Sequence, residues 1–459
     1  MKRLGLLFNY DWDALAFARV AADQQAAARY DFDEAGFDLF SFPSNAHLIH
    51  FDLRRFAARQ ARRGARRGWA GVVSHHEQFG ALAASLVAEQ LGLPGTRPEA
   101  VLAAQHKLHA RRVLQKVAPE ANVGFAELDA QYGAPIPPGL SYPCFAKPVK
   151  AAFSVLAREV KSHAELHAHT RFGGRELWVI RRLVEPFEQV LRERLPEAGS
   201  AHRLMLEDPV PPSTPQYNLD GWAFDGEVQM LGVVDAVMYP GTQAFMRWEY
   251  PSRLAIDIQA RARDVARRFL AEIGFTHGFF NMEFFFDAEH DRLTVIEFNP
   301  RLASQFSDLY RRVLGADVHA MTLALALGQD PRAVPRTVPT AGAAASLVYR
   351  AFPGDATPAM PSASLEARFA QQFANAMLFC YPRQGQALAR DFKWLGSWRY
   401  GIIHLDGRDE QQLRERCLQA SALLGWTAPY ADKLIEPSRR AAATPGWGPH
   451  PSSMPGVIS

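Results

Sequence analysis

The residues best suited to chemistry lie in two strand-like segments beyond the middle of the chain. Segments 279–287 and 293–299 read FFNMEFFFD and LTVIEFN, and the short loop between them is typical of a β-hairpin. With the loop centred on His290, the register gives three cross-strand pairs: Glu283 with Glu297, Asn281 with Asn299, and Phe286 with Thr294. Period-two alternation then places four apolar side chains on the opposite face: Phe280, Met282, Phe284 and Phe286.

Two carboxylates directly opposite each other destabilise a hairpin unless something compensates their charge. Arg301 could neutralise part of this charge. A divalent cation held by oxygen atoms of Glu283, Glu297 and Asn299 would neutralise it more completely, and Mg²⁺ bound together with substrate phosphates suits such a site. The alternative is an exposed acidic face in a different register. The hairpin by itself leaves both interpretations open.

Two lysines are placed where they could bind an anion. Lys147 closes the strand-like segment YPCFAK and precedes Pro148, so its donors are free for phosphate. Lys107 lies in the first turn of a predicted helix that ends before Pro119. Because a cation opposes the helix dipole there, a bound anion is a reasonable partner. For either lysine alone, a solvated surface charge is the ordinary interpretation.

The combination is more specific than its parts. Five features occur in an order that resembles the ATP-grasp superfamily of ligases: Lys107, FAKP at 145–148, LMLEDPV at 204–210, NMEFFFD at 281–287 and IEFNPR at 296–301. The most specific part is a strand-borne acid followed, across a hairpin, by E-x-N-x-R. The resemblance covers residues 70 to 330 and extends more weakly to residue 435. It implies a ligase of the carboxylate-amine type with a biotin carboxylase-like architecture.

The resemblance also implies a binding site for ATP. Lys107 and Lys147 would contact the phosphates, with Lys147 also near the adenine. Glu207 and the backbone of Val210 would form the hinge that holds the adenine edge. Gln216 stands where the family often has an acid for the ribose hydroxyls, and its amide can still form a hydrogen bond with a hydroxyl.

The same resemblance assigns the metal and the reacting groups. Glu283, Glu297 and Asn299 would bind one or two Mg²⁺ ions, in agreement with the argument from the hairpin register. Arg301, and Arg350 in the segment LVYRAF, would face the acyl phosphate or its carboxylate. A planar guanidinium that is always charged suits such an oxyanion.

Besides Gln216, the sequence departs from the family pattern in two further places. The loop after Lys147 is normally rich in glycine, so that the backbone can approach phosphate, but here it reads KPVKAAFSV. Lys150 and Ser154 would supply the missing contacts. Gln305 stands where biotin carboxylases carry the glutamate that acts as the base. Because glutamine cannot accept a proton at neutral pH, a carboxylase is disfavoured.

Strand-like and helix-like segments alternate up to residue 93, which predicts a parallel sheet flanked by helices. The expected fold class is multidomain, α/β and α+β: an ATP-grasp fold with an N-terminal Rossmann-like preATP-grasp domain and a C-terminal α+β domain. The expected parts are the preATP-grasp domain at 1–105, a small ATP-grasp subdomain at 106–200, a large subdomain with the metal site at 201–330, the C-terminal domain at 331–435 and a disordered tail at 436–459.

Composition argues against several classes of protein. The sequence has 51 Lys and Arg against 48 Asp and Glu, a net charge of +3, which gives no support for a nucleic-acid partner. An arginine cluster at 54–67 is the one candidate patch, and Phe56 is the only aromatic residue within it, which is too few for a surface on which bases stack. Cys144, Cys380 and Cys417 are widely spaced without a CxxC motif, which favours a reducing cytoplasm. No apolar run is long enough to cross a bilayer, so no membrane partner is expected, and a homodimer is a possible assembly.

The segment Ser74-His75-His76-Glu77 follows a predicted strand, where parallel α/β folds tend to place ligand contacts. A zinc site there would need a third, distant ligand. Contact with a substrate or with another part of the protein is the alternative.

These features predict an ATP-dependent, ADP-forming ligase that activates a small carboxylate as an acyl phosphate and joins it to an amine through a carbon–nitrogen bond. The expected partners are therefore small-molecule carboxylate and amine substrates. One alternative, suggested by the glycine-free loop, is a nucleotide-binding protein that has lost turnover. Another is an ATP-grasp phosphotransferase or carboxylase.

Overall fold

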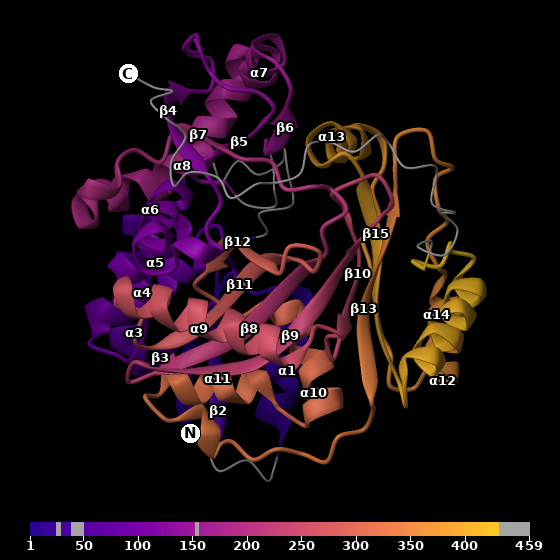
Figure 1. The fold of residues 1–459 in the computed structure, drawn as a ribbon. Helices are drawn as coiled ribbons and strands as arrows, with labels where there is room; N and C mark the ends of the chain where they lie inside the picture. The colour runs from indigo at the N-terminus through magenta and orange to yellow at the C-terminus, as the bar shows by residue number, and fades with distance from the viewer. Residues whose placement is uncertain (24–28, 38–49, 152–155, 431–459) are drawn as a thin grey trace.

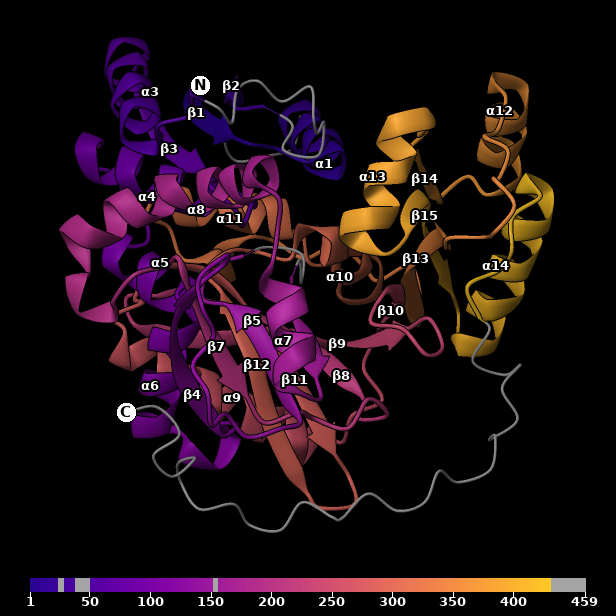
Figure 2. The same ribbon diagram turned by 90° about the horizontal axis from the view of Figure 1, so that it is seen from above.

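The structure is a computed structural model that describes residues 1–23, 29–37, 50–151 and 156–430. Within these ranges the strands form a parallel three-stranded sheet, an antiparallel four-stranded sheet and an antiparallel eight-stranded sheet (Figures 1 and 2). No helix in the described ranges is both long and apolar enough to span a membrane. The expected disordered tail at 436–459 lies outside the described residues, and so does Ser154.

The N-terminal part is built on the parallel sheet that the alternating segments predict. Its order is β2-β1-β3, with β1 (Lys2–Leu7), β2 (Tyr30–Ala35) and β3 (Trp69–Val73), accompanied by helices α1 (Asp11–Ala22), α3 (Leu53–Arg67) and α4 (Gly80–Leu91). Ligand contacts in parallel sheets gather beyond the carboxyl ends of the strands. At this edge, Tyr10 follows β1 and the segment from His75 to Glu77 follows β3.

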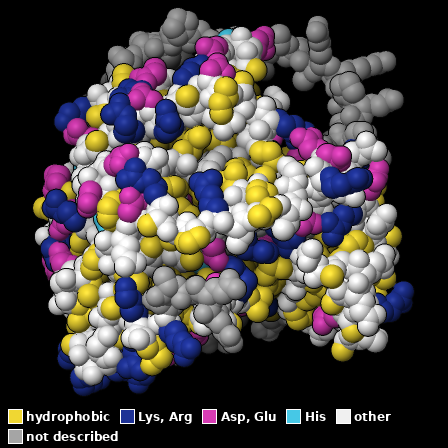
Figure 3. Space-filling model, turned by 90° about the horizontal axis from the view of Figure 1, so that it is seen from below, with side chains coloured by type: hydrophobic (Ala, Val, Ile, Leu, Met, Phe, Trp, Pro, Cys, Tyr) yellow, Lys and Arg dark blue, Asp and Glu magenta, His cyan; other side chains and the backbone are white. Residues whose placement is uncertain are grey.

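The arginine-rich segment forms α3, and several of its charges are paired within the fold. Arg54 forms an ion pair with Glu193. Asp33 pairs with two arginines: its Oδ1 atom lies 3.3 Å from Arg63 Nη2, and its Oδ2 atom lies 2.6 Å from Arg67 Nε. Figure 3 shows acidic side chains elsewhere on the face where Lys and Arg side chains gather at the lower left. The helix therefore carries a partly neutralised face rather than a uniform basic stripe.

A second part carries both of the predicted phosphate lysines. Helices α5 (Pro98–Gln105) and α6 (Lys107–Val117) and the short turn η1 (Pro119–Ala121) lead into it, and Lys107 lies in the first turn of α6 as predicted. The sheet has the order β4-β7-β5-β6, formed by β4 (Phe125–Gln131), β5 (Cys144–Pro148), β6 (Arg158–Val160) and β7 (Arg203–Glu207). Helices α7 (His163–Thr170) and α8 (Gly174–Arg194) and the turn η2 (Pro196–Ala198) connect β6 to β7.

The eight-stranded sheet contains the acidic hairpin and continues into the C-terminal part (Figure 1). Its order is β12 (Arg292–Asn299), β11 (Gly278–Asp287), β8 (Gln216–Phe224), β9 (Glu227–Met238), β10 (Phe245–Tyr250), β13 (Ala343–Ala351), β15 (Trp398–Gly407) and β14 (Met377–Cys380). The remaining helices and turns are α9 (Ile256–Glu272), η3 (Ser304–Phe306), α10 (Ser307–Leu314), α11 (Val318–Ala326), η4 (Pro331–Ala333), α12 (Ala363–Gln372), α13 (Gly385–Leu395) and α14 (Glu410–Leu424).

The pairing of β10 with β13 carries this sheet across residue 330, where the sequence suggests a domain boundary. The regions 201–330 and 331–435 thus share one set of backbone hydrogen bonds, and the proposed boundaries of all five parts stay predictions. A shared sheet restricts movement of one region against the other, because such movement would break strand pairing.

The hairpin of β11 and β12 has the predicted register at its polar end. Two predicted pairs are present: Glu283 with Glu297, and Asn281 with Asn299. The third predicted pair is wrong, because an irregularity after Glu283 shifts the register by one residue and Thr294 faces Phe285 instead of Phe286. The predicted apolar face is buried against α9, with four side chains in one core cluster: Phe280, Met282, Phe284 and Phe286.

Close approach of β8 and β9 next to this hairpin gives a test of the packing. A methyl group at Gly221 would overlap the backbone carbonyl of Gln229 and the ring of Phe280. We expect Gly221→Ala to lower the free energy of unfolding by about 1–3 kcal/mol, because the strands must separate to admit it. Urea denaturation followed by circular dichroism measures this. Gly174→Ala is the matched control, since nothing lies within 4 Å of that position, and equal losses in both variants would contradict the packing argument.

Candidate active site

The two hairpin carboxylates lie on the polar face of the large sheet, and amide groups hold one of them. The Nε2 atom of Gln216 donates to Glu283 Oε2 at 2.9 Å, and the Nδ2 atom of Asn299 donates to Glu283 Oε1 at 3.3 Å. Burial, followed by the nearby charge of Glu297, raises the pKa of Glu283. The carboxylates therefore repel each other in the folded chain, as the register argument predicts.

Lys107 neutralises the second carboxylate. Its Nζ atom lies 2.7 Å from Glu297 Oε2 and also donates to the backbone carbonyl of Ala151 at 3.3 Å. Burial acts to raise the pKa of Glu297, but the ion pair with Lys107 prevails, and the pKa is lowered. The two facing glutamates therefore differ in their charge environment, and in the described part of the chain only Glu297 has an ammonium partner.

This donor set fits a magnesium ion. Glu283, Glu297 and Asn299 provide carboxylate and amide oxygens, the hard donors that Mg²⁺ prefers, and the carboxylates are fixed on adjacent strands. A divalent cation would also relieve the repulsion that raises the pKa of Glu283. The predicted metal residues are thus brought together by the fold, and their role as ligands stays a proposal.

Lys147 belongs to a buried network behind this hairpin. Its Nζ atom lies 2.6 Å from Glu207 Oε1, and the Nε atom of Arg111 donates to the same oxygen at 2.7 Å. Burial, with Arg111 and Lys107 nearby, lowers the pKa of Lys147 to about 8, although Glu207 acts in the opposite direction. The Glu207 carboxylate therefore holds two cations, and Val210, the other predicted hinge residue, is half-buried three residues later.

Arg111 is a site residue that sequence reasoning missed. Its Nη1 and Nη2 atoms donate to the backbone carbonyls of Val295 and Ile296 at 2.7 and 3.1 Å, so one guanidinium ties α6 and β7 to β12. The only signal was its position on α6, one turn beyond Lys107. A single arginine on a helix carries no motif, and its partners come from strands far along the chain.

Lys150 is a buried cation without a carboxylate ion pair among the described residues. Only 2% of it is exposed, and its Nζ atom lies 4.9 Å from the centre of the Phe187 ring. Burial lowers its pKa to about 8, and Glu77, Lys107, Glu297 and Arg301 all contribute to its electrostatic environment. The charge of Glu297, the ion-pair partner of Lys107, therefore also acts on Lys150 in the glycine-free loop.

Arg301 connects the hairpin to the N-terminal sheet. Its Nη2 atom lies 3.0 Å from Glu77 Oε2, and Glu77 follows β3 at the carboxyl edge of the parallel sheet. Tyr10, from the same edge, lies in the field of both residues and stacks on His76 with ring centres 5.1 Å apart. The segment after β3 therefore contacts another part of the protein next to the site, and its contact with a substrate stays a prediction.

Arg350 reaches the same side of the molecule from the C-terminal part of the large sheet. Its Nε atom donates to the carbonyl of Phe245 at 3.1 Å, and Nη1 donates to Ser397 Oγ at 3.0 Å. Burial and the neighbouring Arg399 lower the pKa of Arg350 to about 10. The partners of Arg350 differ from those of Arg301, whose guanidinium pairs with Glu77, so the two predicted arginines are held by different elements.

A polar row on β8 supports the hairpin and was also missed. Asp220 is fully buried, accepting hydrogen bonds from the Tyr310 hydroxyl at 2.8 Å and from Asn281 Nδ2 at 3.1 Å. Asn218 faces Glu283 across the strands. The signal in the sequence was the alternation of Gln216, Asn218 and Asp220, which shares the period of a half-buried strand.

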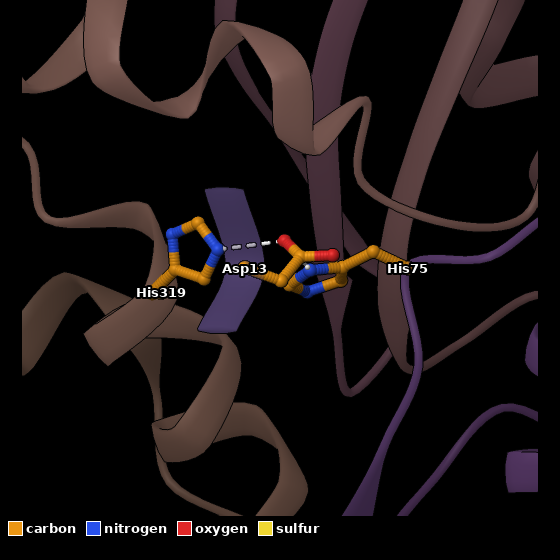
Figure 4. A group of neighbouring side chains, drawn as sticks. All are labelled: Asp13, His75 and His319. Atoms are coloured by element: carbon orange, nitrogen blue, oxygen red, sulfur yellow. Dashed lines mark hydrogen bonds and ion pairs between the residues drawn. The ribbon is translucent and has the colours of Figure 1, made fainter. Parts of the chain in front are cut away.

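A buried cluster joins the N-terminal part to α11. Figure 4 shows Asp13 between His75 and His319, and Asp13 Oδ1 lies 2.9 Å from His75 Nδ1 and 2.9 Å from His319 Nε2. His75 thus meets two distant residues, as a zinc site would require. The separations have the length of hydrogen bonds, so the three side chains form a satisfied polar bridge between α1 and α11.

The sequence matches no protein-family model and no curated protein. The fold, in contrast, is that of the ATP-grasp ligases. An L-amino acid ligase from Bacillus licheniformis superposes with a TM-score of 0.62 at 14% identity, covering 92% of this chain and 97% of the other. A phosphoribosylglycinamide synthetase from Anaerococcus prevotii gives 0.56 at 10% identity, covering 92% and 97%.

A third structure is the biotin carboxylase domain of a 2-oxoglutarate carboxylase from Hydrogenobacter thermophilus, a dimer in complex with MgADP and bicarbonate. It superposes with a TM-score of 0.57 at 13% identity, and the match covers 91% of this chain and 89% of the other. These likenesses confirm the expected fold class over nearly the whole chain.

The Asp13 cluster makes the stability of the fold depend on pH. Burial, followed by the charge of His75, lowers the pKa of His319 even though Asp13 acts in the opposite direction. The unfolded chain therefore takes up a proton that the folded chain resists, so stability is lost as pH falls below about 6.5. The pKa of Asp13 is lowered by both imidazoles against the effect of burial, so protonation of Asp13 at lower pH acts in the same direction.

We expect the melting temperature to fall between pH 7 and pH 5 more steeply in the natural protein than in His319→Gln. Glutamine keeps an N–H donor for Asp13 but does not titrate. Thermal melts in matched buffers measure both slopes, and equal slopes would contradict the assignment. Destabilisation by a chelator at pH 7 would show instead that the cluster holds a metal ion.

Proposed function

We propose that this protein is an ATP-dependent, ADP-forming ligase that joins a small carboxylate to an amine. The observation that carries the proposal is the facing pair Glu283 and Glu297, with the buried or half-buried cations Lys107, Lys147 and Lys150 in its electrostatic surroundings. Buried cations beside paired carboxylates suit a polyphosphate that binds with a metal ion. ATP and Mg²⁺ are therefore the proposed cofactors.

The structures with the same fold support this proposal. Two of them are named as ligases or synthetases, an L-amino acid ligase and a phosphoribosylglycinamide synthetase, and the biotin carboxylase domain holds MgADP. Their low identity to this chain leaves its substrates open, so the carbon–nitrogen bond is proposed from the site together with the fold.

The reaction would proceed in two steps. An oxygen of the substrate carboxylate attacks the γ-phosphorus of ATP, the bond to the β–γ bridging oxygen breaks, and ADP leaves. The amine nitrogen then attacks the carbonyl carbon of the acyl phosphate and loses a proton, and inorganic phosphate leaves. Both steps bring anions together, so positioning and neutralisation of charge are what the protein must supply.

Each cation of the site has a place in this scheme. Lys107 and Lys147 would hold the phosphates, and Lys150 would take the role that glycine backbone has in related loops. Arg301 would stabilise the developing charge of the acyl phosphate through its planar fork. Bound Mg²⁺, held by Glu283, Glu297 and Asn299, would neutralise the phosphate oxygens and align them for displacement.

A carboxylase remains disfavoured. The Nε2 atom of Gln305 donates to Ser346 Oγ at 2.8 Å, so this side chain is engaged with β13, and its amide cannot take a proton from bicarbonate. The absence of a base at position 305 therefore supports a carboxylate-amine ligase rather than a carboxylase.

A nucleotide-binding protein without turnover is the second candidate, because the loop after Lys147 reads KPVKAAFSV without a glycine. An ADP-release screen separates the candidates. Amino acids and related acids and amines are supplied singly and in pairs with Mg-ATP, and the products are analysed by mass. Ligase activity requires ADP and an amide in equal amounts. Binding of ATP by calorimetry with no ADP from any pair would favour the second candidate, and a phosphorylated product would indicate a phosphotransferase.

Removing one facing carboxylate tests the metal assignment. We expect Glu297→Gln to lower the rate of ADP release by a factor of about 10² to 10³, because the site loses charge that positions the phosphates. The variant should still fold, because the amide keeps the shape of the carboxyl group and the lost repulsion with Glu283 offsets part of the lost ion pair with Lys107. Glu289→Gln, on the exposed hairpin loop, is the matched control and should retain full activity. Full ADP release by Glu297→Gln would refute the assignment.

A further inference from the structure

Two arginines face each other across neighbouring strands in the C-terminal part of the large sheet. Arg350 on β13 and Arg399 on β15 are cross-strand partners, and the register shifts next to this pair. Like charges directly opposite each other destabilise a sheet. The arrangement is the counterpart of the facing glutamates on β11 and β12, with the opposite sign of charge.

Within the described ranges, neither arginine has a carboxylate partner. Among the described residues no ion pair reaches Arg350 or Arg399, and the Nη2 atom of Arg350 makes no hydrogen bond. The guanidinium of Arg399 lies over the ring of Tyr381, 4.6 Å from its centre, and forms no hydrogen bond there. The charge of Arg399 acts on Asp391, but the ion pair of Asp391 is with Arg383, whose Nε atom lies 3.5 Å from Asp391 Oδ2.

Both guanidinium groups are nevertheless held in place. Arg350 is fixed by the carbonyl of Phe245 and the hydroxyl of Ser397, and Arg399 is fixed by stacking on Tyr381. Both side chains are half-buried rather than extended into solvent. Ordered, partly buried cations with free donors are suited to a planar anion, because each can donate to one oxygen without a further loss of side-chain freedom.

Hydrogen bonding connects the strand that carries Arg350 to the segment that follows Arg301, the arginine proposed for the acyl phosphate. Arg350 is four residues beyond Ser346 on β13, and Ser346 accepts a hydrogen bond from Gln305, which follows Arg301 by four residues. Tyr10 lies in the electrostatic field of both Arg301 and Arg399. Arg301 and Arg399 are therefore both near enough to Tyr10 for their charges to act on its hydroxyl group.

We propose that Arg350 and Arg399 form a subsite for a second carboxylate, one that does not react, on one of the two substrates. This inference rests on the proposed ligase function. The reacting carboxylate or amine would lie at Arg301, and the second carboxylate would be held by one donor from each of the paired arginines. Arg399 then determines specificity for substrates such as α-amino acids, which carry a carboxylate beside the amine.

The test compares acids with their neutral amides in the natural protein and in Arg399→Met. Methionine keeps the length of the side chain but removes the charge. ADP release is measured with L-amino acids and with the matched L-amino acid amides, each varied while the other substrate is saturating. We expect KM for the carboxylate-bearing substrate to rise about 10-fold to 100-fold in Arg399→Met, with kcat nearly unchanged and KM for the amide unaffected. The substrate whose KM responds is the one that carries the second carboxylate.

Two further variants separate recognition from stability. Arg399→Lys restores the charge and should recover part of the discrimination between acid and amide. Arg414→Met is the matched control. Arg414 also lies over a tyrosine ring, 5.3 Å from the centre of Tyr430, but it belongs to α14, which packs against the other face of β13 and β15. An equal rise of KM for acid and amide in Arg399→Met, or no rise for either, would overturn the subsite.

A binding measurement keeps this inference independent of turnover. The melting temperature is recorded with malonate and with malonamide, its neutral counterpart. We expect a shift with malonate that Arg399→Met reduces and Arg414→Met does not. If no substrate pair releases ADP, the ligase proposal fails while the malonate difference still tests the subsite. A malonate shift that is the same in all three proteins would refute the subsite even if the ligase is active.

Discussion

The repulsion between Glu283 and Glu297 is the constraint on which the site depends. The opposite face of the same hairpin is apolar and packs into the core, so the register cannot slip by one residue without exposing Phe284 and its neighbours. Burial of the apolar face therefore fixes the two carboxylates opposite each other at a cost. Elements elsewhere in the chain must supply the compensating charge, and this requirement explains why α6 begins with Lys107 directly above the hairpin.

Three of the cations around this acidic pair form ion pairs with acids from other elements, whereas Lys150 forms none among the described residues. Three ion pairs form the framework of the site: Lys107 with Glu297, Lys147 with Glu207, and Arg301 with Glu77. A buried charge without a partner would cost far more than these pairs contribute. A bound polyphosphate would therefore replace these carboxylates as the partner of cations that are already in position. This lowers the reorganisation that binding requires.

Local patterns allowed the hairpin, its polar register and the start of α6 to be predicted, because these depend on alternation and on turn length within a few residues. The shifted register after Glu283 could not be predicted, since one irregular residue changes no pattern in the sequence. The roles of Arg111 and Glu77 were equally hidden. Their partners, Glu207 and Arg301, lie far along the chain, and only the packing of separate sheets brings them together.

The continuous hydrogen bonding of the large sheet fixes the distance between its two charged pairs. The facing glutamates on β11 and β12 and the facing arginines on β13 and β15 belong to one hydrogen-bonded sheet, joined through β8, β9 and β10. Moving one charged pair relative to the other would require the intervening strands to part, because their ladders are continuous. The sheet thus sets the separation between the proposed metal site and the proposed carboxylate subsite. Substrate length, and not only substrate charge, would then decide which molecule engages both ends of the site.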